Sequence, residues 1–269
     1  MGFSVLMSVY AKENPAYLRE AVESVFRQTM VPDEVLIMED GPLTDALEET
    51  MIELKARHPQ IVTWQFPQNV KLGRSLAKGV ELCSQELIAR MDTDDIAVED
   101  RFRMQYEYMM AHPQIRVCGG WLQEFNDTHT YTRVKQMPET EEEIRNYGKY
   151  RNPLNHMTVM FRRSAVLEAG NYRNFPLLED YELWSRMLAA GSGFYNMQKV
   201  LVHMRTNEDM YGRRGGLTYF RQYRALRKEQ KELGLLSRKE YVMALILTAG
   251  MTLQPTFLRK YMYRRLLRS

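Results

Sequence analysis

Short apolar runs alternate with amphipathic stretches over the first 95 residues of the chain. Between the runs, apolar residues recur at helical spacing, as at Leu18, Val22 and Val25. Alternation of strands and helices predicts βαβ units and an α/β fold with a Rossmann-like, mostly parallel central sheet and flanking helices. The runs that read as strands are FSVLMSV (3–9), EVLIM (34–38), IVTWQF (61–66) and LIARM (87–91).

The helices between these runs have recognisable ends. Asn14 and Pro15 are an N-cap and a first helical residue, and His58-Pro59 stops the next helix, expected over 44–57. A third helix is expected over 74–83. Right-handed crossovers then place the carboxyl ends of all four strands on one edge of the sheet.

Polar residues follow each of these strands. Tyr10, Asp40, a loop that begins at Asn69 and the cluster Asp92 to Asp95 should therefore share one edge, where open α/β sheets bind ligands. Adjacent carboxylates repel each other, so the cluster needs a cation, hydrogen-bond donors or water. An oxygen-rich site with few protein ligands suits Mg²⁺ or Mn²⁺ that carries substrate phosphates, and a solvated acidic turn is the alternative.

Two further segments carry candidate chemistry. The acidic pair Glu179-Asp180 opens a helix whose apolar stripe is Tyr181, Trp184 and Leu188. Such a pair could be a helix cap and nothing more. His156 precedes a strand-like run over 157–161.

Charge divides the chain into two parts. The whole chain carries +3 and residues 211–269 carry +11, which leaves −8 for residues 1–210. We therefore expect a catalytic domain over 1–210 and a basic helical extension over 211–269. A basic amphipathic tail suits an anionic membrane surface. The alternative is a tail helix that packs on the domain with its bases in solvent.

Other features of the composition argue against a membrane-spanning protein, a cysteine-bound metal site and a nucleic-acid-binding protein. No apolar run approaches the ~18–20 residues of a spanning helix, and the longest covers 241–253. Cys83 and Cys118 have no cysteine or histidine at metal-ligand spacing, so both are expected to be reduced core thiols. The acidic first 210 residues do not favour nucleic-acid binding.

Several motifs in this order resemble family 2 glycosyltransferases of the A-type fold. They are FSVLMSVY, QTMVPDEVLIMEDGP, NVKLGRSLAKG, LIARMDTDD, NPLNHMTVMFRRSAVLEAGNY and FPLLEDYELWSRMLAAG. The segment MYGRRGGLTYF is similar to exopolysaccharide and capsule enzymes of the amylovoran-biosynthesis type.

The resemblance implies a role for each matching residue. Asp94 would be the direct ligand of Mn²⁺ or Mg²⁺, and Asp92 would contact the ribose or support the metal. Asp180 would be the general base that deprotonates the acceptor hydroxyl. The implied donor-binding residues are Tyr10 against the base, Asp40 as acceptor from a ring N–H, Lys71 or Arg74 near the nucleotide, Asp92 and His156.

Structural roles remain open for several of these residues. Asp95 is either a group that supports the metal ligands or the N-cap of a helix from Ile96 onward. Tyr10 could cover the sheet edge, Asp40 could be a turn residue, and His156 could be structural. Basic residues after the third strand could be solvated, and His203, Trp121 and Trp184 are expected to be structural.

The resulting prediction is an inverting, metal-dependent glycosyltransferase. It would move a sugar from a nucleotide sugar, a UDP-sugar being favoured, to a hydroxyl of a polysaccharide repeat unit that is linked to lipid. It would be cytoplasmic and peripheral at the inner face of the cell membrane. An inactive relative, or an adaptor that uses the basic tail, is the alternative. A haloacid-dehalogenase phosphatase would place its nucleophile strand first, and a nucleotidyltransferase would need a glycine-rich loop after the first strand.

Overall fold

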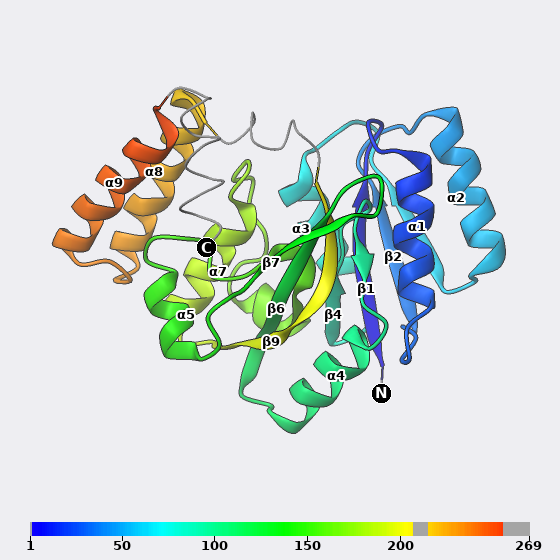
Figure 1. Cartoon of the computed structure of the whole chain (residues 1–269), viewed down its shortest axis with the longest axis horizontal. Helices are drawn as coiled ribbons and strands as arrows, with labels where there is room; N and C mark the ends of the chain where they lie inside the picture. The colour runs from blue at the N-terminus through cyan, green and yellow to red at the C-terminus, as the bar shows by residue number, and fades with distance from the viewer. Residues whose placement is uncertain (1, 207–214, 255–269) are drawn as a thin grey trace.

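The computed structural model describes residues 2–206 and 215–254. All the strands in this part of the chain belong to a single mixed sheet. Its nine strands follow the order β3-β2-β1-β4-β8-β6-β9-β5, and β7 pairs with β6 outside this path (Figure 1). The strands are β1 (Phe3–Val9), β2 (Glu34–Glu39), β3 (Ile61–Gln65), β4 (Leu87–Arg90), β5 (Ile96–Ala97), β6 (Ile115–Phe125), β7 (Tyr131–Lys135), β8 (Met160–Arg162) and β9 (Gly193–Arg205).

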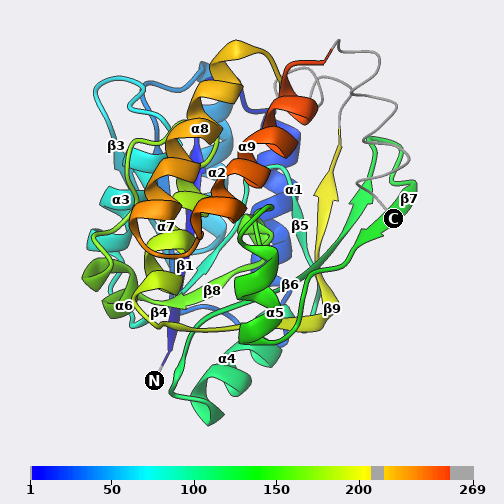
Figure 2. The ribbon, with the colours of Figure 1, turned by 90° about the vertical axis from the view of Figure 1, so that its left-hand side faces the viewer.

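Helices cover both faces of this sheet (Figures 1 and 2). They are α1 (Pro15–Phe26), α2 (Asp45–Arg57), α3 (Leu72–Leu82), α4 (Arg101–Ala111), α5 (Glu141–Tyr147), α6 (Arg163–Glu168), α7 (Glu179–Ala189), α8 (Leu217–Glu232) and α9 (Arg238–Thr252). A single 3₁₀ turn among the described residues, η1, spans His156–Thr158. The α/β class with flanking helices is therefore confirmed.

Strands β1 to β4 form the parallel part of the sheet. Val5 and Met7 of β1 pack into the core beneath α1, α2 and α4, whereas Leu6 packs into the core beneath α3, α6 and α7. Helices cover both faces of β1, β2 and β4, so these strands are mainly apolar, whereas β3 lies at the edge of the sheet and exposes Val62 and Trp64. The second half of the sheet is mixed, since β8 runs antiparallel to β4 and β6 while β6 runs parallel to β9.

Two local expectations about secondary structure are wrong. The run over 157–161 is not a continuous strand, because η1 occupies its first half and β8 begins at Met160. Thr158 fixes this turn: its hydroxyl donates to the Asn155 carbonyl at 2.8 Å and accepts the Gly120 N–H at 3.1 Å. The residues after Asp95 form strand β5, and the following helix α4 begins only at Arg101.

The basic extension is helical where the structure describes it. Helices α8 and α9 pack against each other, and α8 packs on α7 at one end of the molecule (Figure 1). Arg227 of α8 is buried and donates to the Lys149 and Tyr150 carbonyls and to the Tyr181 hydroxyl. One base of the predicted basic extension therefore belongs to the interface with the rest of the chain. The last part of the predicted basic extension, FLRKYMYRRLLRS (257–269), lies outside the described residues, as do residues 207–214.

No helix among the described residues is both long enough and apolar enough to cross a bilayer. Both cysteines are free and buried, as expected of core thiols. Burial raises the pKa of each thiol to about 12.

Candidate active site

The carboxyl ends of the first four strands meet at one edge of the sheet, as the sequence predicts. The parallel registers of β1 with β2 and β4 bring the residues after Val9, Glu39 and Arg90 to that edge. Tyr10 stands there with 40% of its surface exposed, and Asp40 is bonded through its N–H to the Val9 carbonyl. The edge therefore presents an exposed aromatic ring next to a buried acid.

Asp40 holds the loop that follows β3. Its Oδ2 accepts from the Asn69 side chain at 2.9 Å, and its Oδ1 accepts the Val70 N–H at 2.6 Å. The next residue, Lys71, has a φ of 76°, a strained backbone conformation for a residue with a side chain. Lys71 caps α3, and Lys71 and Arg74 are both exposed at the start of this helix. Asp40 thus fixes the position of two basic side chains at the edge.

The acid cluster after β4 is crowded and partly buried. Side-chain oxygens of Asp92, Asp94 and Asp95 all lie within 4.8 Å of one another. Burial, together with the nearby charges of Asp92 and Glu13, raises the pKa of Asp94 to about 7. Asp92 forms an ion pair with the buried Arg90. The cluster needs more positive charge than these side chains alone supply.

Asp95 is not a helix cap. Its Oδ1 accepts the backbone N–H of Arg205 at 2.9 Å, and it is 1% exposed. Burial and the two neighbouring acids raise the pKa of its carboxyl well above the usual range. Its Oδ2 is buried and has no hydrogen-bond partner among the described residues. Asp95 therefore anchors the acidic turn to the end of β9, which agrees with the other role considered for it, that of supporting the metal ligands.

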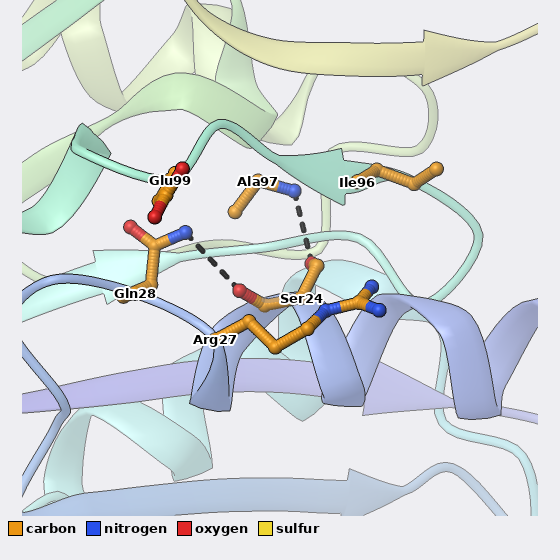
Figure 3. A pocket seen from close by; sticks show the side chains of 6 residues that line it. All are labelled: Ser24, Arg27, Gln28, Ile96, Ala97 and Glu99. Carbon is orange, nitrogen blue, oxygen red and sulfur yellow. Dashed lines mark hydrogen bonds between the residues drawn. The ribbon is translucent and has the colours of Figure 1, made fainter.

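Strand β5 attaches the other end of this turn to α1 (Figure 3). The N–H of Ala97 donates to the Ser24 hydroxyl at 3.0 Å. The Gln28 side chain also donates to the Val98 carbonyl at 2.8 Å. Arg27 and Glu99 complete a small pocket over this contact. The pocket lies on the α1 side of β5 and is lined by none of the clustered acids, so we regard it as part of the packing that fixes the turn.

The acidic pair Glu179-Asp180 opens α7, as the sequence predicts. Asn152 donates to Oδ2 of Asp180 at 2.5 Å, which orients this carboxylate. Burial raises the pKa of Asp180, and burial with the Asp180 charge raises the pKa of Glu179 to about 7. Burial thus favours the protonated form of both carboxyls, and the hydrogen bond from Asn152 favours the charged form of Asp180.

A glycine brings this pair close to the start of α3, next to the loop that Asp40 holds. A Cβ at Gly73, in the first turn of α3, would lie 2.4 Å from the Arg173 carbonyl oxygen and 3.3 Å from Cβ of Glu179. Only a residue without a side chain fits this close approach. The start of α3, with Lys71 and Arg74, therefore lies directly beside the start of α7.

His156 is held in an aromatic setting. Its Nε2 lies 2.8 Å from the Tyr172 hydroxyl, and its ring packs edge-on against the buried Trp184. Burial and the charge of Arg90 lower the pKa of His156 well below its ordinary value, so the ring is neutral near pH 7. Trp184 is a core residue, as expected, and His203 packs its ring edge-on against Tyr131.

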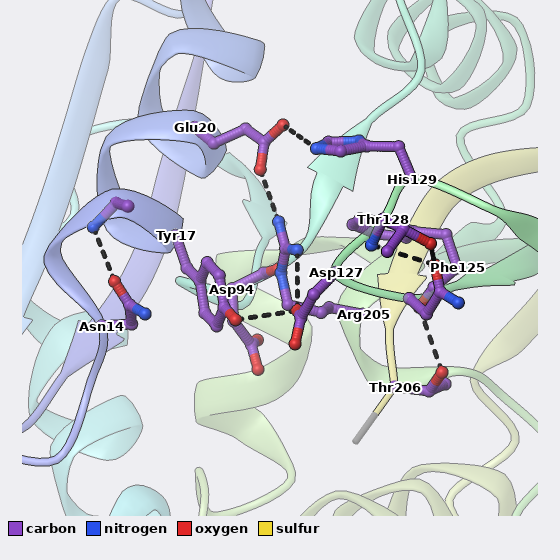
Figure 4. Close-up of polar contacts among 12 residues, drawn as sticks. Asn14, Tyr17, Glu20, Asp94, Phe125, Asp127, Thr128, His129, Arg205 and Thr206 are labelled. Atoms are coloured by element: carbon purple, nitrogen blue, oxygen red, sulfur yellow. Dashed lines mark hydrogen bonds and ion pairs between the residues drawn. The ribbon is translucent and has the colours of Figure 1, made fainter.

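Sequence reasoning missed two arginines at this edge. Arg90 is a charged residue inside a run that otherwise reads as apolar, and that interruption could have marked it. Arg205 ends β9 and contacts Asp94, Asp127 and Glu20 (Figure 4). It lies 110 residues beyond the acids, so no local pattern connects it to them.

The donor set fits a divalent cation. Several carboxylate oxygens converge, one buried oxygen of Asp95 lacks a partner within the described part of the chain, and Asp94 resists ionisation without added positive charge. Hard cations such as Mg²⁺ and Mn²⁺ prefer such oxygens. Asp92 and Asp94, which are less buried than Asp95, are the residues that could hold it.

Comparison with known proteins identifies the protein family and the enzyme class. The sequence model named "Glycosyl transferase family 2" matches residues 4–170, which is more than half of the chain. The chain belongs to glycosyl transferase family 2. As a member, it is a glycosyltransferase that uses a nucleotide sugar, and its A-type fold and enzyme class agree with the prediction from sequence.

Two relatives match nearly the whole chain. The chain is 34% identical over 266 residues to "Amylovoran biosynthesis glycosyltransferase AmsE" of Erwinia amylovora, covering 98% of each. It is 32% identical over 266 residues to "UDP-Gal:alpha-D-GlcNAc-diphosphoundecaprenol beta-1,3-galactosyltransferase" of Escherichia coli, covering 99% of this chain and 96% of the relative.

A solved structure supports the fold. S. aureus TarS 1-349 in complex with UDP-GlcNAc superposes with a TM-score of 0.68 at 14% identity, over 99% of this chain and 76% of TarS 1-349. At this sequence identity, the structural similarity supports only the assignment of the fold.

Proposed function

We propose that this glycosyltransferase family 2 member is an inverting, metal-dependent enzyme that transfers a sugar from a UDP-sugar to a hydroxyl of a lipid-linked polysaccharide repeat unit. The observation that carries this proposal is the meeting of three groups at one sheet edge: the acid cluster, the loop held by Asp40, and the Glu179-Asp180 pair beside α3. The E. coli relative, whose name specifies UDP-Gal and a diphosphoundecaprenol acceptor, supports the donor and the lipid.

In this proposal, each donor-binding residue contacts a different part of the nucleotide sugar. Tyr10 would lie against the base, and Asp40 would accept from a ring N–H through lone pairs left free by its bonds to the loop. Lys71 and Arg74 would face the diphosphate, and His156 would contact donor or acceptor as a neutral ring. Asp94 and Asp92 would hold Mn²⁺ or Mg²⁺, which offsets negative charge on the leaving diphosphate.

The acceptor side depends on Asp180. Its carboxylate would take the proton of the acceptor hydroxyl while that oxygen forms a bond to C1 of the sugar. The bond from C1 to the diphosphate oxygen breaks on the opposite side, so the configuration at C1 is inverted. Asn152 keeps the carboxylate oriented for this step.

The C-terminal helices are proposed to hold the enzyme at the anionic inner face of the membrane. Helix α9 exposes Val242, Met243, Ile246 and Leu247, and α8 exposes the bases Arg221, Arg224 and Lys228. An apolar face with neighbouring positive charge suits a bilayer that contains acidic lipids.

The first test separates binding from turnover. Calorimetric titration of UDP and GDP, with and without Mn²⁺, should show metal-dependent binding that favours UDP. Asp94→Asn should remove the metal-dependent part of binding. Asp180→Asn should leave UDP affinity within about twofold and lower turnover by at least about 10²-fold, because only the general base is lost.

Asp100→Asn is the matched control, since Asp100 is an exposed acid paired with Arg103. Asp100→Asn should change neither UDP affinity nor turnover. Equal loss of binding and turnover in Asp180→Asn would show that Asp180 is structural. Absence of binding by either nucleotide would favour an inactive relative, and preference for GDP would overturn the proposed donor.

A further inference from the structure

Arg205, the last residue of β9, is bonded to one side chain and one backbone carbonyl of the acidic turn. Its N–H donates to Oδ1 of Asp95 at 2.9 Å. Its Nε donates to the Asp94 carbonyl oxygen at 3.1 Å (Figure 4). Two consecutive residues of the turn are therefore held by one residue of another strand.

The rest of the guanidinium is anchored on two other elements. Nη1 donates to Asp127, in the turn between β6 and β7, at 3.2 Å, and Nη2 donates to Glu20 of α1. The guanidinium also lies over the Tyr17 ring, 3.9 Å from its centroid, and over the Phe125 ring, 4.6 Å from its centroid. Tyr17 in turn donates to Asp127 at 2.7 Å.

These contacts exclude a direct role for Arg205 in binding the donor. The side chain is 5% exposed, and each of its three nitrogens already donates to an oxygen of this chain. Its planar fork bonds in three directions at once, which a lysine ammonium cannot reproduce with the same geometry. The side chain therefore fixes the position of the turn relative to α1 and the β6–β7 hairpin.

We propose that Arg205 is a positioning residue for the divalent-cation site, holding the acidic turn in the conformation in which the carboxylates of Asp92 and Asp94 converge. This inference rests on the proposed function, which assigns the cation to those two acids. Groups that orient metal ligands from outside the coordination shell commonly change metal affinity by 10–100-fold when they are removed.

The test compares two arginine-to-lysine substitutions. Arg205→Lys keeps the charge and the backbone N–H that Asp95 accepts, but it loses the fork. Arg162→Lys is the matched control: Arg162 is half-buried and donates to two carbonyls, those of Ile115 and Met109, but it pairs with Leu87 at the opposite end of β4. Bound Mn²⁺ is measured by electron paramagnetic resonance with UDP present, and turnover is measured as a function of Mn²⁺ concentration.

Arg205→Lys should weaken Mn²⁺ binding by about 10-fold and raise the Mn²⁺ concentration needed for half-maximal rate by the same factor. At saturating Mn²⁺, kcat should stay within about twofold of wild type, because no group that touches the reactants has changed. Arg162→Lys should leave Mn²⁺ affinity unchanged. Arg205→Ala, where it folds, should weaken Mn²⁺ binding further than the lysine variant does.

Unchanged Mn²⁺ affinity in Arg205→Lys would overturn the positioning role. So would a fall in kcat that saturating Mn²⁺ does not restore, or an equal loss of affinity in Arg162→Lys. Failure of the wild-type protein to bind Mn²⁺ with UDP would be a different result, because it would contradict the proposed function from which this inference starts.

Discussion

Single acids at the sheet edge differ in how their charge is accommodated. Asp40 accepts from two groups of the Asn69 loop and Asp180 accepts from Asn152, so each carboxylate is stabilised by donors. Glu179 is 9% exposed and lies beside the charge of Asp180, which raises its pKa to about 7. Burial raises the pKa of both Asp180 and Glu179, so ionisation of either carboxyl opposes folding, and Glu179 is the acid of this pair that has no proposed catalytic role.

Glu179→Gln should therefore stabilise the protein in a pH-dependent way. The pKa of Glu179 lies above its ordinary value in the folded state, so the folded state binds the proton more tightly and wild type loses stability as pH rises from 4.5 to about 7. This shift corresponds to at most about 3 kcal/mol. The variant should gain about 2 kcal/mol more at pH 8 than at pH 5 relative to wild type, as measured by thermal denaturation.

Glu49→Gln, at an exposed position on α2, should change stability equally at both pH values. A Glu179→Gln variant that behaved in this way too would contradict the assigned burial of the Glu179 charge.

The backbone of Lys71 offers a second test at this scale. Its φ of 76° costs a residue with a side chain about 1–3 kcal/mol and costs glycine little. Lys71→Ala and Lys71→Gly should weaken UDP binding to the same extent, because both remove the ammonium. The glycine variant should be the more stable of the two by about 1 kcal/mol in denaturant titration. Equal stability would show that the loop relaxes in the alanine variant.

At the scale of elements, sequence patterns predict strands and helices that local residues determine. They do not predict contacts between residues that are far apart along the chain. Apolar runs predict β1, β2 and β4 because both faces of these strands are largely buried, and an apolar run also predicts the more exposed edge strand β3. Helical spacing predicts α1 and α7. The strand β5 after Asp95 is not predictable in this way, because its two residues pair with Val202 and His203, more than 100 positions away along the chain. The same distance separates Arg205 from the acids it contacts.

The contact between α3 and α7 is the element-scale feature that joins the proposed donor-binding residues to the proposed general base. Gly73→Ala would place a Cβ against the Arg173 carbonyl, a backbone atom that cannot rotate away. Overpacking of this kind costs about 1–3 kcal/mol. We expect that loss in denaturant titration, together with a fall in turnover that exceeds the change in UDP affinity.

Gly250→Ala is the matched control, because nothing lies within 4 Å of a Cβ at Gly250 in α9. It should stabilise the protein by up to about 1 kcal/mol, since alanine favours a helix more than glycine does. Stabilisation of a similar size by Gly73→Ala would show that α3 and the loop before α7 are not in tight contact.

At the scale of the whole molecule, helices α8 and α9 together form one end of the enzyme. It lies at the opposite side of the molecule from α2 (Figure 1). Ile246 of α9 is 60% exposed and Ile52 of α2 is 70% exposed, so aspartate at either position leaves the core intact. Ile246→Asp should lower partitioning onto phosphatidylglycerol vesicles about tenfold or more, and Ile52→Asp should not change it.

Sedimentation with vesicles of phosphatidylglycerol and of phosphatidylcholine measures this effect. Wild type should prefer the anionic vesicles, and added salt should weaken its binding. Equal partitioning of both variants would contradict a membrane role for α9.

The bond between Asp95 and Arg205 also sets an order of events during synthesis. The two residues are 110 positions apart, and a ribosome needs roughly 5–20 s to add that length of chain. Until then, the crowded acids after β4 lack the partner that fixes their turn. The newly made amino-terminal half can pair β1, β2 and β4, but the proposed cation site is completed only when β9 has left the ribosome. A nascent chain released before that point would carry most of the proposed nucleotide-binding edge, and its acidic turn would not yet be fixed.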